Sequence, residues 1–380
     1  ATAVVLLAGA GLLTRSFVRL QTVNLGIQTE NLMVANVSVD PLKYEGPEAL
    51  NQFFQGVLDE VRAMPQVLSA SIVDKVPIRH PWTNWETWDS DNPPDESRRA
   101  PLAFARCVSP SDFDVMGVPI LQGGDHERQD VTNALPPVVV NQVLAEALFP
   151  QEDPIGRRLS VNFIMAEVRE YEIVGVAGDM RITAVSQSPP FQMYFGFARA
   201  HPMPTNSRHL MVRTQGDLAS LVSAIRRKAL ERDPDAPLTE VSTMTDVVSA
   251  SLTGNRVLSL ATALFAVTAL LLSMTGLYAV LAYYVSRRTR EIGIRLAFGA
   301  TGVHVMRSVL GRGLVLVSIG LGVGFACAFG VTRLLQAQLY QVGTTDPFTF
   351  VSVGTGLLVI GALASLLPAR RATRVDPVRA

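Results

Sequence analysis

The sequence contains few charged residues for its length. Only 17% of its 380 residues are Asp, Glu, Lys or Arg, whereas 48% are hydrophobic. An ordinary soluble domain carries about 25% charged residues. The deficit indicates that part of the chain lies in lipid, and the length leaves room for two or more domains.

Lysine is absent after residue 250. The remaining part contains twelve arginines and only three acidic residues, a net charge of +9 in a chain whose total net charge is zero. The first 250 residues therefore hold 21 basic and 30 acidic residues, a net charge of −9. A basic C-terminal part thus follows an acidic N-terminal part, and the acidic part is not expected to bind nucleic acid.

Motifs for catalysis, cofactors and metals are also lacking. The two cysteines, Cys107 and Cys327, lie in parts of different composition, so we expect no disulfide between them. The five histidines are scattered and form no His-Glu-x-x-His pattern. There is no phosphate-binding loop ending in Lys-Ser/Thr and no recognisable nucleophile motif. We therefore predict no catalytic residue, no cofactor and no metal site.

Three runs of 30, 20 and 23 residues contain no charged side chain. Because about 20 apolar residues suffice to cross a bilayer, we predict transmembrane helices at 257–286, 311–333 and 347–369. Three such runs within 130 residues disfavour the alternative of buried helices in a soluble protein. Residues 1–16 are apolar but short, and we interpret them as the end of a truncated transmembrane helix.

Arginine positions predict the orientation of these helices. Four arginines lie within 287–304 and four more within 370–380, whereas 334–346 has none. The positive-inside rule then places 287–304 and the C-terminal tail in the cytoplasm. Residues 17–250 then lie on the extracytoplasmic side of the cell (inner or plasma) membrane. No charged residue lies deep in a complete span, which disfavours ion-coupled transport.

Residues 17–250 are predicted to form an extracytoplasmic α+β domain. Two segments alternate strand, helix and strand, at 32–39, 47–64 and 67–73, and at 209–213, 218–230 and 237–241. We expect these two βαβ units to pair into one sheet covered by helices. Between them, 110–180 is predicted to be an inserted, β-rich subdomain, with strands at 136–141, 156–164 and 171–176 and a helix at 142–149.

All three tryptophans, Trp82, Trp85 and Trp88, repeat every three residues in one segment. The acids that accompany them lack the spacing of a calcium loop, so we interpret the segment as a solvated loop. The tryptophans are explained either by local packing of this loop or by a recognition surface for a partner or apolar ligand. We keep both interpretations.

The segment after the first complete span has the sequence RRTREIGIRLAFGAT, residues 287–301. On a helix, Ile292, Leu296 and Gly299 share one face, and Gly299 is placed to end that helix. A basic stretch that only fixes topology is the alternative. The apolar and small residues favour a helix that lies against another protein.

This segment resembles the R-x-x-E-I-G-I-R-x-A-x-G-A signature of the MacB/FtsX family of ABC-transporter permeases. The ending LPARRATRVDP, residues 367–377, resembles the family's C-terminal motif, and DPIGRRL (153–159) and IVGVAGD (173–179) are similar to its MacB-like periplasmic core domain. With GLLTRSF at 11–17, the chain is most similar to the C-terminal repeat of the duplicated ADOP-type permeases. One departure is Phe298, where a smaller aliphatic residue is usual.

The resemblance implies a non-catalytic permease subunit with a porter-like outer domain carrying an inserted β-rich subdomain. A cytoplasmic ABC ATPase would dock on a coupling helix made by Arg290, Glu291, Ile292, Gly293, Ile294, Arg295, Leu296 and Gly299. Other implied partners are the lipid bilayer, a second permease half or a second copy, and an extracytoplasmic adaptor. The implied function is export or extraction of an unidentified substrate. An FtsX-like regulator of outer enzymes and a membrane-anchored binding protein are the alternatives.

Overall fold

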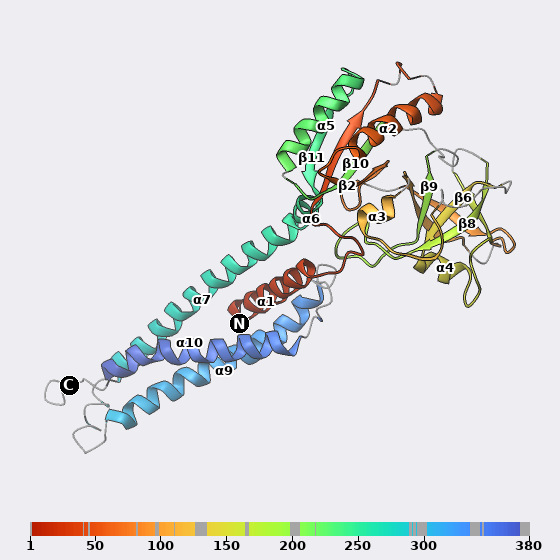
Figure 1. Ribbon diagram of the computed structural model, residues 1–380. Coiled ribbons are helices and arrows are strands. Elements are labelled where there is room, and N and C mark those ends of the chain that lie inside the picture. Colours follow the sequence, from red (N-terminus) through yellow and green to blue (C-terminus); the bar gives the residue numbers. More distant parts are fainter. Residues whose placement is uncertain are drawn as a thin grey trace. The chain divides into compact units, whose positions relative to one another are not determined.

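The computed structural model describes residues 2–40, 42–44, 46–80, 83–95, 99–109, 111–125, 135–163, 167–197, 206–216, 218–288, 291, 294, 302–334, 343 and 346–372. The chain forms two compact units (Figure 1). Val23–Leu252 make the α/β unit. Ala1–Thr22 and Thr253–Ala380 make the helical unit.

The α/β unit contains a four-stranded antiparallel sheet in the order β11-β1-β10-β2. Its strands are β1 (Leu32–Ser38), β2 (Val67–Val73), β10 (Ser207–Thr214) and β11 (Leu238–Thr243). Helix α2 (Gly46–Arg62) connects β1 to β2, and α5 (Leu218–Arg232) connects β10 to β11. Each pair of strands joined by a helix is separated by one strand of the other pair, which is the split βαβ arrangement of ferredoxin-like folds. The two predicted βαβ units and their common sheet are confirmed.

Burial explains why these segments form this sheet. The apolar side chains of α2 recur at helical spacing and are buried at Leu50, Phe53, Phe54, Val57, Leu58 and Val61. Along β1, Met33 and Ala35 pack into the core beneath α2 and α5, whereas Leu32 and Val34 pack into a second core on the opposite face. The second core includes residues from α3 (Asp112–Met116) and α6 (Met244–Ser251).

Six further strands pair in a closed ring, β3-β7-β8-β6-β9-β4. They are β3 (Asn84–Asp89), β4 (Leu102–Val108), β6 (Pro137–Asn141), β7 (Arg158–Asn162), β8 (Arg169–Ala177) and β9 (Gln192–Gly196). A third apolar core draws side chains from all six strands and from α4 (Gln142–Leu148). Strand β5 (Ile120–Gly123) adds to β8, and the pair Val73–Val108 joins the ring to the four-stranded sheet.

The inserted β-rich subdomain is therefore larger than predicted. Its ring of strands extends from residue 84 to residue 196, whereas the sequence predicted 110–180. The strands predicted at 156–164 and 171–176 are confirmed as β7 and β8, which pair antiparallel. Strands β3, β4 and β9 were missed because they interleave polar and aromatic residues and pair with strands distant in the sequence.

The tryptophan segment is a strand, and its interpretation as a loop was wrong. Trp85 is 8% exposed and packs edge-on against Phe163, with ring centroids 5.1 Å apart. Trp88 is half-buried. Because side chains alternate along a strand, residues three apart point to opposite faces, so Trp85 and Trp88 do not share a surface. Trp82 lies outside the described residues.

A buried ion pair joins the ring to the four-stranded sheet. Arg106 on β4 and Asp112 on α3 are both fully buried and 2.8 Å apart. The other carboxylate oxygen of Asp112 accepts a hydrogen bond of 2.9 Å from Ser71 on β2. The Nε of Arg106 donates to the carbonyl of Lys75 at 3.0 Å. Removal of either partner would leave an uncompensated buried charge.

Asp74 gives the α/β unit a pH dependence. Burial raises the pKa of this carboxyl from its ordinary value of 3.8 to about 6, although its Oδ1 accepts a hydrogen bond from the Cys107 amide. The folded state therefore binds the Asp74 proton more tightly than the unfolded state, and this group lowers stability as pH rises from 4 to 6.

We expect Asp74→Asn to be more stable relative to the wild type at pH 7 than at pH 4, by roughly 2–3 kcal/mol. The amide retains an acceptor for the Cys107 N–H but does not ionise. Urea unfolding followed by tryptophan fluorescence measures this, because all three tryptophans belong to the α/β unit. Asp114→Asn, which removes a carboxyl at an exposed position of α3, is the control. A difference that is constant from pH 4 to 7 would contradict the assignment.

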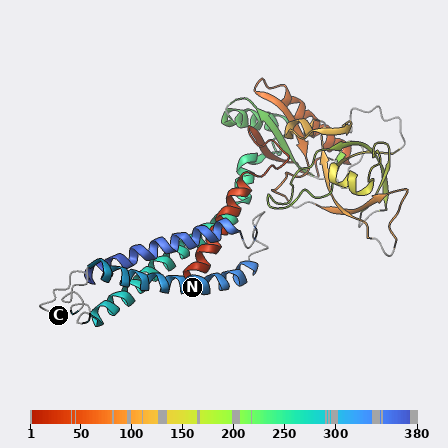
Figure 2. The same ribbon diagram turned by 90° about the horizontal axis from the view of Figure 1, so that it is seen from below.

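The described residues of the helical unit include the long helices α1 (Thr2–Gln21), α7 (Thr253–Arg287), α9 (Gly302–Leu334) and α10 (Pro347–Ala372). All four are long and apolar enough to cross a membrane. Figure 2 shows them running along one another within this unit. Helix α1 continues five residues beyond the predicted end at residue 16 because Phe17, Val18 and Leu20 extend its apolar pattern past Arg15. The observed α9 also begins nine residues before the predicted span.

Candidate functional site

Arginine and tyrosine side chains gather where α7 ends. The guanidinium carbon of Arg287 lies 5.3 Å from the ring centroid of Tyr283, and that of Arg288 lies 5.0 Å from the ring centroid of Tyr284. From α9, Arg312 approaches the same Tyr284 ring to 4.3 Å and donates a hydrogen bond to its hydroxyl. We call these five residues the Arg–Tyr cluster. It connects α7 to α9 next to the predicted coupling segment.

Of the predicted coupling residues, the structure describes Glu291 and Ile294, both in helical conformation. Glu291 pairs with Arg288, three residues earlier in the sequence, at 3.5 Å, and Ile294 is 52% exposed. The other predicted residues, Arg290, Ile292, Gly293, Arg295, Leu296 and Gly299, lie outside the described residues. The common face proposed for Ile292, Leu296 and Gly299 therefore stays a prediction.

Close contacts between small residues join α9 to α10. A Cβ atom at Gly361 would lie 2.7 Å from a methyl carbon of Val317, and one at Gly313 would lie 2.4 Å from the hydroxyl of Ser365. Glycine at these positions allows the two backbones to approach. Farther along, Phe350 stacks on Phe329 with ring centroids 5.0 Å apart. The two helices are packed too closely to move independently at these points.

At the start of α10, Asp346 ties this helix to α1. Its Oδ2 accepts hydrogen bonds from the Thr349 amide at 3.0 Å and hydroxyl at 2.7 Å, which caps the helix. The same oxygen forms an ion pair with Arg15 of α1. Sequence reasoning missed this pairing, although an Asp before the first residue of an apolar run, with Thr three residues later, signals a helix start.

The described part of the chain offers no site for a metal. No group of three His, Cys, Asp or Glu side chains is placed there to hold one. Within the described residues of the helical unit, the buried polar side chains are serines and threonines: Ser16, Ser259, Thr332, Thr349 and Ser365. The arrangement is suited to helix packing.

Comparison with known families accounts for both units. The MacB-like periplasmic core domain matches residues 1–228, and the FtsX-like permease C-terminal domain matches residues 263–377. The chain belongs to the MacB/FtsX-like permease family. It is an ABC-transporter permease by family, with a β-rich periplasmic-type domain and four helices that could span the membrane. The family resemblance carried by residues 153–159, 173–179, 287–301 and 367–377 is thereby confirmed.

The permease is similar to the macrolide export ATP-binding/permease protein MacB of Azoarcus sp. strain BH72. The two are 27% identical over 273 residues, which is 68% of this chain and 39% of that protein. The pyoverdine export ATP-binding/permease protein PvdT of Pseudomonas putida is 25% identical over 259 residues, 67% of this chain and 39% of PvdT. The chain thus spans about two fifths of the length of these relatives.

Among solved structures, the periplasmic region of MacB from Actinobacillus actinomycetemcomitans is similar to the permease. The match covers 59% of this chain and 94% of that one, with a TM-score of 0.40 and 13% sequence identity. The extracellular domain of YknZ, described as a noncanonic ABC-type transporter of Gram-positive bacteria, matches 56% of this chain and all of that one, with a TM-score of 0.36 and 12% identity.

Proposed function

We propose that this permease receives force from a separate cytoplasmic ABC ATPase and transmits it through its helices to the α/β unit, in export or extraction of a substrate still to be identified. We assign ATP hydrolysis to that ATPase, and the 380 residues of this chain contain no phosphate-binding loop. The ATPase docks on the coupling helix formed by Arg290 to Gly299. The α/β unit lies outside the membrane and the C-terminus lies in the cytoplasm.

The single observation that carries the proposal is the Arg–Tyr cluster. It holds the end of α7 against α9 at the point where the coupling segment begins, with Glu291 paired to Arg288. A displacement of the coupling helix would therefore move α7 and α9 together. Helix α7 leads directly into the α/β unit, because α6 ends at Ser251 and α7 begins at Thr253.

The packing of the helices supports transmission of motion over conduction. Close contacts at Gly313 and Gly361 hold α9 against α10. The ion pair of Arg15 with Asp346 connects the start of α10 to α1. Within the described residues of this unit, no buried side chain carries a charge. Proton or ion pathways through a membrane ordinarily require such groups.

Export is favoured over regulation of outer enzymes because the relatives are named for the export of macrolides and of pyoverdine. We further propose a second permease half or a second copy of this chain as the partner in the membrane. An extracytoplasmic adaptor would meet the α/β unit. The cell or inner membrane is the proposed location.

Gly361→Leu tests transmission separately from docking. A side chain at this position would collide with Val317 and push α10 from α9, whereas the coupling segment is unchanged. We expect the ATPase to bind normally but its rate in lipid nanodiscs to fall about tenfold, since overpacking costs about 1–3 kcal/mol. Gly322→Leu is the matched control, because nothing lies within 4 Å of a Cβ at that position. Equal ATPase rates for the two variants would refute transmission through the α9–α10 contact.

A further inference from the structure

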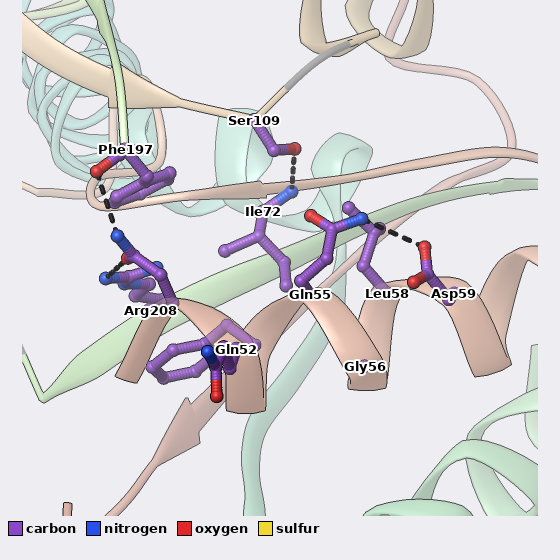
Figure 3. Close-up of a pocket in the computed structure, with 11 residues that line it drawn as sticks. Gln52, Gln55, Gly56, Leu58, Asp59, Ile72, Ser109, Phe197 and Arg208 are labelled. Atoms are coloured by element: carbon purple, nitrogen blue, oxygen red, sulfur yellow. Dashed lines mark hydrogen bonds between the residues drawn. The ribbon is translucent and has the colours of Figure 1, made fainter. Parts of the chain in front are cut away.

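A cavity of about 410 Å³ opens in the α/β unit beside helix α2. Figure 3 shows its lining residues, which come from α2, from β2 and β10 of the four-stranded sheet, and from Ser109 and Phe197 next to the ring of strands. Sites for small organic ligands typically measure ~300–1,000 Å³ and combine apolar walls with a few polar groups. The walls here include Phe54, Leu58 and Ile72, with the amides of Asn51, Gln52 and Gln55.

Arg208 on β10 is the one charged side chain on this wall that is buried, with 3% of its surface exposed. Its guanidinium lies between two aromatic rings, 4.5 Å from the centroid of Phe54 and 4.0 Å from that of Phe197. It donates a hydrogen bond of 2.6 Å to the side-chain oxygen of Asn51. Burial lowers the pKa of Arg208 to about 10, so the group still carries its charge at neutral pH.

The hydrogen-bonding capacity of this cation is not filled. Among the described residues its Nε has no hydrogen-bond partner, and no carboxylate of those residues forms an ion pair with it. Buried charges in proteins are ordinarily paired, because taking an ion out of water is costly. Arg106, the other fully buried arginine on the described chain, does have its carboxylate in Asp112. Arg208 is thus a buried cation without a carboxylate partner among the described residues, and an anionic ligand could supply that partner.

We propose that this cavity is a binding site for a small carboxylate with an apolar body, held by an ion pair with Arg208. A guanidinium forms two parallel hydrogen bonds with a carboxylate, and the Phe54 and Phe197 rings fix its plane. Asp59 also lines the cavity, but it is exposed and accepts a hydrogen bond from Gln55, so Arg208 is the charge on the buried part of the wall. The side-chain amides of Gln52 and Gln55, both exposed residues of the lining, supply further donors. The site does not depend on the ATPase coupling proposed above.

The probe for this site is 2-naphthoate, a planar aryl carboxylate small enough for the cavity, with the neutral 2-naphthamide as its counterpart. Binding is measured by equilibrium dialysis against the full chain in nanodiscs, with empty nanodiscs subtracted. We expect saturable binding of naphthoate, and roughly tenfold to hundredfold weaker binding of naphthamide, because hydrogen bonds to charged groups contribute about 1.5–3 kcal/mol. Arg208→Gln should weaken naphthoate binding by the same factor, while Arg226→Gln, at an exposed position of α5, should not.

A second variant blocks the cavity without touching the cation. Gln55→Trp places a large ring at the mouth from an exposed position of α2, where Gln55 bonds only to Asp59 one turn later. Gln142→Trp is its matched control, since Gln142 is also exposed and also bonds to an acid one turn later on α4. We expect loss of naphthoate binding in Gln55→Trp alone. Failure of naphthoate to bind the wild type, or undiminished binding in folded Gln55→Trp, overturns the proposal whether or not Arg208→Gln folds.

Discussion

Simultaneous replacement of Arg290, Glu291 and Arg295 by alanine is expected to abolish association of the permease with its ATPase. These charges flank the apolar face predicted for the coupling helix. Three such contacts at the centre of an interface should together weaken binding roughly hundredfold or more. Co-purification from membranes with the ATP-binding subunit, followed by titration of that subunit against permease in nanodiscs, measures the loss.

The matched control is Arg226→Ala with Arg227→Ala and Glu231→Ala. These are also two arginines and one glutamate, all exposed on helix α5 of the α/β unit. Their replacement changes the charge by the same amount, and the ATPase should bind this variant as it binds the wild type. If the variant of residues 290, 291 and 295 keeps its ATPase, docking on the coupling segment is refuted. If both triple variants lose the same ATPase affinity, the loss comes from the change in net charge and not from the coupling segment.

Arg106→Met is expected to destabilise the α/β unit by about 3–5 kcal/mol, the cost of leaving a buried charge without its partner. The carboxylate of Asp112 would keep only its hydrogen bond from Ser71 among those described above. The free energy of unfolding of a typical domain is about 5–15 kcal/mol, so this loss is a large fraction of it. Urea unfolding followed by tryptophan fluorescence measures it.

A second substitution separates the unpaired charge from lost packing. Arg106→Met combined with Asp112→Leu removes both charges, and we expect it to recover at least half of the lost stability. Arg158→Met is the surface control. Arg158 pairs with Asp91 where both side chains are 49% exposed, so its loss should change stability far less than the loss of Arg106. A double variant as unstable as Arg106→Met would show that shape, rather than charge, sets the cost.

The parts of the fold that sequence reasoning reached were those with a local pattern. The helical spacing of Leu50, Phe53 and Val57 and the apolar run 137–140 identify α2 and β6 without reference to the rest of the chain. The ring of strands depends on pairings between distant segments, such as β4 with β9, and those leave no periodic signal. The tryptophan strand was misread because only Trp85 and its alternate neighbours face the core.

The candidate sites also differ in whether a local sequence pattern or a long-range contact creates them. The coupling segment was found from a short motif, whereas the Arg–Tyr cluster beside it appears only in the structure. Arg312 lies 28 residues after Tyr284, and their contact requires α7 and α9 to pack. Arg208 gave no signal at all, because its burial arises when Phe54 and Phe197, 143 residues apart in the sequence, meet around it.

In the proposed mechanism, ATP-driven motion reaches the α/β unit. A spin label at Arg226→Cys, an exposed site on α5, reports this when the second permease subunit of the ATPase complex carries an outer label as well. Cys327 is exposed and is replaced by serine, whereas Cys107 is buried and stays unlabelled. Pulsed electron paramagnetic resonance measures the distance between the two outer spin labels. We expect this distance to change when ATP and vanadate are added to the wild type, and to stay the same in the alanine variant of residues 290, 291 and 295. An unchanged distance while the bound ATPase hydrolyses ATP would contradict the account.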